Sequence, residues 1–134
     1  MRPETSSLLS PFSFVLPTAI RYGEGIAGAL PEELASSGYK RILVITDRVV
    51  AALPFFEALI HDLHGRGLLV EVYDRVEANP KDRDVAESAE AAERMEADCV
   101  VAVGGGSPMD CAKAASVVAV QGGEARDYEG GKGI

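Results

Sequence analysis

The segment with the clearest chemical meaning is DCVVAVGGGSPMDCAKAAS, which spans residues 98–116. Its apolar, β-branched first part ends abruptly in three glycines and a serine, and Pro108 then opens a pattern of small residues typical of a helix. The segment therefore predicts a strand, a tight turn and the start of a helix in succession. Such a junction directs unpaired backbone N–H groups and the positive end of a helix dipole at one point, which suits a phosphate or diphosphate group.

Each residue of this turn has an expected part in binding. Gly105, Gly106 and Ser107 form the cradle for a diphosphate and Gly104 shapes the turn, because side chains would block the close approach of a ligand. Ser107 is expected to cap the helix, and Pro108 suits its first turn, where the missing N–H is no loss. The alternative is a tight strand-to-helix turn without a ligand, since turns are rich in glycine for steric reasons alone.

The rest of the chain alternates between short apolar runs, which predict strands, and amphipathic stretches, which predict helices. Pro54 interrupts one helical pattern, so a short helical turn should precede a new helix start there. The expected strands lie at residues 12–16, 42–46, 68–73 and 99–103, and the expected helices at 26–34, 49–63, 81–95 and 108–120. This alternation predicts an α/β fold with a doubly wound, mainly parallel sheet and flanking helices, which is Rossmann-like.

The two ends of the chain differ from this pattern. We expect residues 1–10 to be a loose N-terminus and residues 11–134 to form an incomplete dinucleotide-binding domain. The glycine-rich residues 121–134 carry no further pattern of a strand or helix, which is an unusual way to end a domain. If a neighbouring strand is missing, a sheet edge is left unpaired, so we expect self-association and a homo-oligomer.

Polar residues follow three of the expected strands, at the edge where sheets of this type bind their ligands. These residues are Asp47, Asn79 and the glycine turn. The Asp47 carboxylate could accept hydrogen bonds from both hydroxyls of an adenosine ribose, and it would repel a 2′-phosphate, which favours NAD over NADP. Alternatively, Asp47 simply caps the helix that starts at Val49, and Asn79, which precedes Pro80, is a turn and cap residue.

Composition excludes several classes of partner and location. The 134 residues carry 13 basic and 21 acidic side chains, a net charge of −8, which argues against nucleic acid or an anionic membrane surface. No window has the roughly 18 apolar residues of a spanning helix, and no signal-peptide core is evident. Cys99 and Cys111 make no disulfide framework, so we expect a cytoplasmic protein. His61 and His64 lie one helical turn apart, but two imidazoles alone do not complete a metal site.

Four landmarks resemble those of the iron-containing (group III) alcohol dehydrogenases. The segment GGGSPMDCAKAAS is similar to the family motif GGGSxxDxAK, and it is preceded, in the family's order, by Tyr22-Gly23, by a strand ending in Thr46-Asp47 and by Asn79-Pro80. The resemblance implies hydride transfer between NAD and an alcohol/aldehyde pair. It also implies that this chain is the first third of such an enzyme. A helical domain that binds Fe or Zn through an Asp and three His would then be absent, and the isolated piece would be inactive.

The resemblance also gives further residues a role. It implies that Asp47 contacts the ribose, that Asn79 lines the nucleotide site and that Asp110 faces the nicotinamide and the substrate. Alternatively, Asp110 is an acidic residue near a helix N-terminus that complements the dipole and pairs with Lys113. Two other functions remain open: a fragment similar to dehydroquinate synthase or glycerol dehydrogenase, and a non-enzymatic nucleotide-binding or interaction module.

Overall fold

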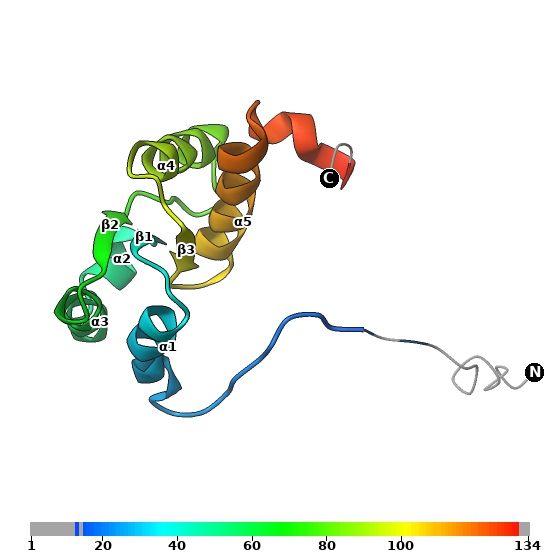
Figure 1. Cartoon of the computed structure of the whole chain (residues 1–134). Helices are drawn as coiled ribbons and strands as arrows, with labels where there is room; N and C mark the ends of the chain where they lie inside the picture. Colours follow the sequence, from blue (N-terminus) through cyan, green and yellow to red (C-terminus); the bar gives the residue numbers. More distant parts are fainter. Residues whose placement is uncertain (1–12, 14, 132–134) are drawn as a thin grey trace, which may run out of the picture.

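A computed structural model describes residue 13 and residues 15–131 of the chain (Figure 1). The expected loose N-terminus, residues 1–10, lies outside the described residues. The strand expected at residues 12–16 is wrong where it can be checked, since Ser13, Val15 and Leu16 have no strand geometry. Val15 and Leu16 are 79% and 51% exposed, so these side chains are not buried against a sheet.

Three parallel strands form the sheet that organises the described part of the chain. β1 (Arg41–Ile45) lies in the centre, between β2 (Leu69–Tyr73) and β3 (Cys99–Ala102). Ile45, the last residue of β1, is in register with both Tyr73 and Ala102, so the three strands end at one edge. Residues 42–45 are fully buried, as the continuous apolar run predicts for a central strand covered on both faces.

Helices cover both faces of the sheet (Figure 1). On one face, Leu43 and Ile45 pack against α4 (Asp82–Arg94) and α5 (Gly106–Gln121). On the other face, Ile42 and Val44 pack against α1 (Leu30–Ser36) and α3 (Pro54–Gly65). A 3-10 turn, η2 (Ile26–Ala29), precedes α1, and α2 (Arg48–Ala51) is the short turn of helix expected before Pro54. These two layers of helices confirm the predicted doubly wound α/β fold.

The C-terminal segment differs from its prediction. Residues 121–134 were expected to carry no helix, yet η3 (Ala125–Gly131) is a 3-10 helix. It forms because Asp127 accepts a hydrogen bond from the Glu124 N–H at 2.8 Å and the Tyr128 hydroxyl bonds to the Gly122 carbonyl. Tyr128 also packs against the core beside α4 and α5, which ties this segment to the domain.

No helix among the residues 13 and 15–131 is long and apolar enough to cross a membrane.

Candidate functional site

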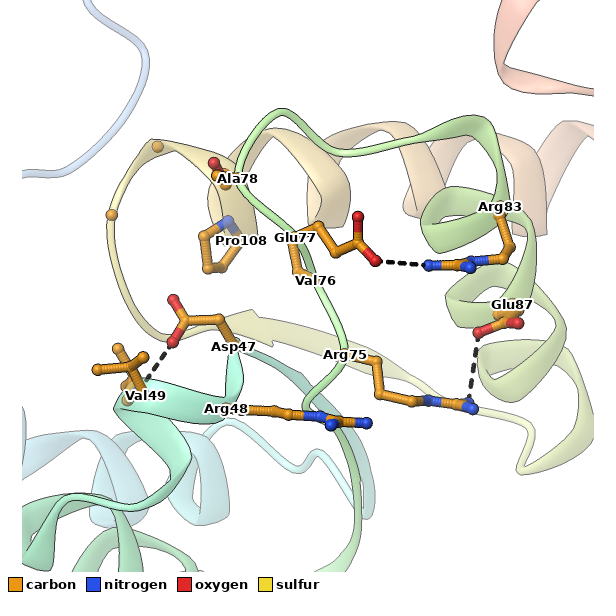
Figure 2. A pocket seen from close by; sticks show the side chains of 14 residues that line it. Asp47, Arg48, Val49, Arg75, Val76, Glu77, Ala78, Arg83, Glu87 and Pro108 are labelled. Atoms are coloured by element: carbon orange, nitrogen blue, oxygen red, sulfur yellow. Dashed lines mark hydrogen bonds and ion pairs between the residues drawn. The ribbon is translucent and has the colours of Figure 1, made fainter.

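A cavity of about 770 Å³ lies at the edge where the three strands end (Figure 2). This size suits a small molecule or cofactor. The chain that follows each strand contributes to its wall, and α4 closes one side. The lining residues are Asp47, Arg48, Val49, Val50, Arg75, Val76, Glu77, Ala78, Arg83, Glu87, Gly105, Gly106, Ser107 and Pro108.

The glycine turn brings the backbone of α5 to the cavity without intervening side chains. Gly104 has a φ of 138°, and a Cβ there would lie 2.9 Å from Cγ of Pro108, so this position requires glycine. A Cβ on Gly105 or Gly106 would meet nothing within 4 Å. Both glycines line the cavity. A Cβ on either would therefore occupy space at the cavity and would not displace protein atoms.

The start of α5 differs from its prediction by two residues. The helix begins at Gly106, its cap residue is Gly105, and no side chain caps it, so Ser107 is not the cap. Glycine is tolerated there because it costs little stability at a helix cap. The first N–H groups of a helix also have no partner inside the helix. Pro108 still lies in the first turn. The N-terminus of a 16-residue helix therefore opens on the cavity with backbone donors that no side chain satisfies.

Asp47 is the N-cap of α2, and its Oδ1 accepts a hydrogen bond from the Val50 N–H at 2.8 Å. The capping alternative is therefore confirmed. The bond occupies one carboxylate oxygen and fixes the side chain beside the cavity, opposite Pro108 (Figure 2). Capping thus leaves acceptor capacity for a ligand, since a carboxylate has two oxygens. Contact with a ribose stays a prediction.

Asn79 and Asp110 do not line the cavity of the described chain. Asn79 is an exposed turn residue with a φ of 59°, next to the lining residue Ala78, and the cap of α4 is Lys81. Asp110 is the fifth residue of α5, so it lies in the second turn of the helix and not the first. Its carboxylate lies 4.0 Å from the ammonium of Lys113, which is the pair expected from their spacing.

The loop between β2 and α4, together with α4 itself, supplies site residues that the sequence did not reveal. Arg75 pairs with Glu87 at 3.4 Å, and Arg83 pairs with Glu77 at 3.0 Å. Hydrogen bonds from Lys81 and Arg83 lower the pKa of the Glu77 carboxyl, so it is ionised at neutral pH. The only signal in the sequence was the cluster of charges that follows β2, which is also typical of a solvated helix face.

Asp84 is the buried group that holds this loop in place. Its carboxylate is fully buried and accepts hydrogen bonds from the Tyr73 hydroxyl at 3.3 Å and the Lys81 N–H at 3.2 Å. Burial first, and then the hydrogen bond to Glu87, raise the pKa of Tyr73, so its hydroxyl remains a donor. The loop that walls the cavity is therefore anchored to both β2 and α4.

The charges around the cavity balance. Three arginines (Arg48, Arg75 and Arg83) face three carboxylates (Asp47, Glu77 and Glu87), so the wall is neutral although the chain carries −8. The uncapped helix N-terminus adds a positive partial charge to this neutral wall. An anionic group therefore meets less repulsion in this cavity than the net charge of the chain alone would suggest.

The histidines and cysteines lie elsewhere. His61 and His64 line a separate hollow beside α3, and Cys99 and Cys111 are unpaired thiols. Within the part of the chain that the structure describes, no three His, Cys, Asp or Glu side chains gather in a way that could hold a metal ion.

A parallel sheet covered on both faces, with a glycine turn leading into an uncapped helix at its carboxyl edge, defines a Rossmann-like domain. Residues 17–134 match the family model for iron-containing alcohol dehydrogenase. The chain belongs to this family, as the resemblance implied.

Named relatives cover nearly all of this chain. Alcohol dehydrogenase 4 of Schizosaccharomyces pombe is 32% identical over 127 residues, which is 94% of this chain and 30% of the yeast protein. Choline dehydrogenase of Bacillus subtilis is 36% identical over 121 residues, covering 90% of this chain and 30% of that protein. The chain thus spans about 30% of the length of these relatives.

Solved structures are similar to this chain in fold. A 1,3-propanediol oxidoreductase superposes with a TM-score of 0.81 at 30% identity, covering 90% of this chain and 32% of that one. Sulfoacetaldehyde reductase from Bifidobacterium kashiwanohense, solved in complex with NAD+, also gives a TM-score of 0.81, at 27% identity, covering 93% and 32%.

Proposed function

We propose that this chain is the nucleotide-binding part of an NAD-dependent alcohol dehydrogenase, which transfers hydride between NAD and an alcohol/aldehyde pair. One observation carries the proposal: the uncapped N-terminus of α5 opens, through glycines without side chains, on a cavity of about 770 Å³. A helix N-terminus of this kind binds phosphate through its backbone N–H groups and its dipole. The relative solved with NAD+ supports the choice of ligand.

The diphosphate of the dinucleotide fits the turn formed by Gly105, Gly106 and Ser107, with Gly104 setting the backbone angle. The open space beside the glycine Cα atoms supports this fit, since any side chain there would enter the volume that the ligand needs. Asp47 accepts hydrogen bonds from the ribose hydroxyls through the oxygen that its cap bond leaves available. The same charge repels a 2′-phosphate, so NAD is favoured over NADP.

Asn79 and Asp110 have weaker support. The family resemblance implies that Asn79 lines the nucleotide site, and its neighbour Ala78 does line the cavity. We propose that Asn79 lines the nucleotide site and that Asp110, which is exposed on α5, faces the nicotinamide and the substrate.

The family resemblance implies that the metal ligands, an Asp and three His, lie in another part of the full-length enzyme. A divalent Fe or Zn ion, when bound there, polarises the substrate oxygen as a Lewis acid. This chain's own residues bind and orient the dinucleotide. We therefore expect no reduction of NAD when the chain is assayed with small alcohols and added Fe²⁺ or Zn²⁺, whereas clear turnover would contradict this expectation.

The partners and compartment follow from the same proposal. The dinucleotide and a small alcohol are the ligands, and neither nucleic acid nor a membrane is a partner. β2 and β3 are the edges of the described sheet, so we propose that the chain associates with copies of itself. Light scattering tests this, and a monodisperse monomer would contradict it. The unpaired thiols of Cys99 and Cys111 support a reducing compartment, and we propose the cytoplasm.

Calorimetric titration of the 134-residue chain with NAD and with ADP-ribose tests the central proposal. We expect saturable binding of both ligands, because both carry the diphosphate and the adenosine ribose. Adenosine, which lacks the diphosphate, should bind at least ~100-fold more weakly, a difference of about 2.7 kcal/mol. Absence of binding by both NAD and ADP-ribose would contradict the proposal.

A further inference from the structure

The three arginines that line the cavity are not equivalent. Arg75 is paired with Glu87 at 3.4 Å and also lies 5.0 Å above the Tyr73 ring, while Arg83 is paired with Glu77. Figure 2 shows both guanidinium groups engaged by carboxylates on the α4 side of the cavity. No ion pair joins Arg48 to a carboxylate of residues 13 and 15–131. Among the described residues, Arg48 is therefore the lining arginine that forms no ion pair with a carboxylate.

The backbone of Arg48 is held beside the proposed adenosine side of the site, and its side chain is exposed. It is the first residue of α2 and directly follows Asp47, whose side chain is held by the bond to the Val50 N–H. The chain at this point stays paired with β2, because the Thr46 N–H donates to the Tyr73 carbonyl at 2.8 Å. Arg48 extends from α2 toward the loop that carries Arg75, along the cavity wall (Figure 2).

Asp47 and Arg48 have opposite effects on a 2′-phosphate. A phosphate monoester brings a charge of about −1.5 to −2 at neutral pH, and the Asp47 carboxylate repels it. A guanidinium group beside the acidic residue is the group that accommodates a 2′-phosphate in Rossmann-like sites, through charge-assisted and often bidentate hydrogen bonds. This chain carries both groups on consecutive residues that line the same cavity.

We propose that Arg48 is a specificity-determining residue that gives the cavity affinity for the 2′-phosphorylated dinucleotide. The chain then binds NADP as well as NAD, and Arg48 narrows the preference for NAD that Asp47 creates. This inference rests on the proposed function, because it takes the cavity as a dinucleotide site. Arg75 and Arg83 differ from Arg48 because Glu87 and Glu77 already pair with them.

The test compares Arg48→Gln with wild type and with Arg94→Gln by calorimetric titration with NAD and NADP. Arg94 is paired with Glu71 at 2.6 Å and does not line the cavity, so the control makes the same change of charge outside the site. We expect Arg48→Gln to weaken NADP binding about tenfold and NAD binding less than about threefold, the loss of one exposed charge-assisted contact. The difference should shrink as salt is raised, and Arg94→Gln should match wild type for both ligands.

A second variant tests the inference while Arg48 stays unchanged. Asp47→Asn retains an oxygen that can cap α2 but removes the charge, so NADP affinity should rise about tenfold and approach or exceed NAD affinity. Equal losses of NAD and NADP affinity in Arg48→Gln would overturn the inference, as would binding of NAD without measurable binding of NADP to wild type. Either result would leave the proposed function intact. Failure of wild type to bind NAD, NADP and ADP-ribose would overturn both.

Discussion

The two edges of the same sheet are built for different tasks. At the amino-terminal edge, the Asp98 carboxylate accepts hydrogen bonds from the Lys40 and Arg41 N–H groups at 2.9 and 3.0 Å, and the Arg41 side chain donates to the Met95 carbonyl. At the carboxyl-terminal edge, the first turn of α5 has no side-chain cap and opens on the cavity. The polar groups at the amino-terminal edge are thus bonded within the protein, whereas at the carboxyl-terminal edge no side chain caps the start of α5.

An acidic side chain therefore has a different role at each edge of the sheet. An acidic side chain that accepts backbone N–H groups at the amino edge links β1 to β3 and serves the fold. Asp47 makes a similar bond at the carboxyl edge, yet it also lines the cavity. Substitutions at the amino edge should therefore change stability alone, whereas those at the carboxyl edge should change ligand binding.

The largest expected effect on ligand affinity is that of Gly105→Val. A side chain there meets no protein atom within 4 Å of its Cβ but takes up the space of the diphosphate, so NAD affinity should fall about 100-fold, or about 2.7 kcal/mol. The free energy of unfolding should change by less than about 1 kcal/mol. Titration calorimetry and urea denaturation measure the two quantities.

The matched control is Gly65→Val, at the end of α3 on the opposite side of the sheet, where a Cβ also meets nothing within 4 Å. It should leave NAD affinity unchanged. Equal losses of affinity in both variants would remove the distinction between the edges.

Gly104→Ala should affect stability and binding together. Its φ of 138° strains any other residue, and the new Cβ would lie 2.9 Å from Pro108, so we expect a loss of about 3 kcal/mol in unfolding free energy. NAD binding should weaken because the turn must shift. Gly67→Ala, with a φ of 78° but no neighbour within 4 Å, should cost only about 1 kcal/mol and leave binding intact. Similar losses of stability in the two variants would contradict the close packing of Gly104.

Asp47→Ala should give a smaller effect on both quantities. Loss of the cap bond to Val50 should reduce the free energy of unfolding by about 1 kcal/mol. Loss of the ribose acceptor should weaken NAD binding about tenfold, whereas Asp47→Asn should keep most of the stability. If Asp47→Ala alters stability without altering NAD affinity, the residue is a cap alone.

The smallest expected effect is the pH dependence contributed by Asp98. Burial would raise the pKa of its carboxyl, but hydrogen bonds from the Arg41 and Lys40 N–H groups outweigh it, and the pKa lies below its unfolded value of 3.8. The stabilisation is therefore present above pH 3.8 and is lost as the pH falls through the lower, folded-state pKa. Thermal melts of wild type and Asp98→Asn should differ near pH 7 and converge in strong acid. NAD affinity near pH 7 should be the same in both.

Most of the fold follows from local patterns. The apolar run at residues 42–46 predicts a strand buried on both faces, and the break at Pro54 separates α2 from α3. These features depend on periodicity and backbone sterics, which a sequence carries directly.

The remaining features depend on contacts between distant segments. The start of α5 at Gly106 could not be predicted because glycine has poor helix propensity, and the structure tolerates it at the end of the helix that opens on the cavity. The arginines of the cavity wall acquire their roles only when α4 packs beside β2 and supplies Glu87 to Arg75. The alternation at residues 12–16 was misleading where it can be checked, since Ser13, Val15 and Leu16 form no strand.

The central claim is that a dinucleotide binds through the backbone N–H groups at the start of α5. An amide NMR titration of the chain with ADP-ribose measures these groups one by one. The account predicts the largest shifts at Gly105, Gly106 and Ser107, with little change at Lys40, Arg41 and Asp98. Saturable binding that leaves the first set unmoved, or that shifts the second set instead, would contradict it.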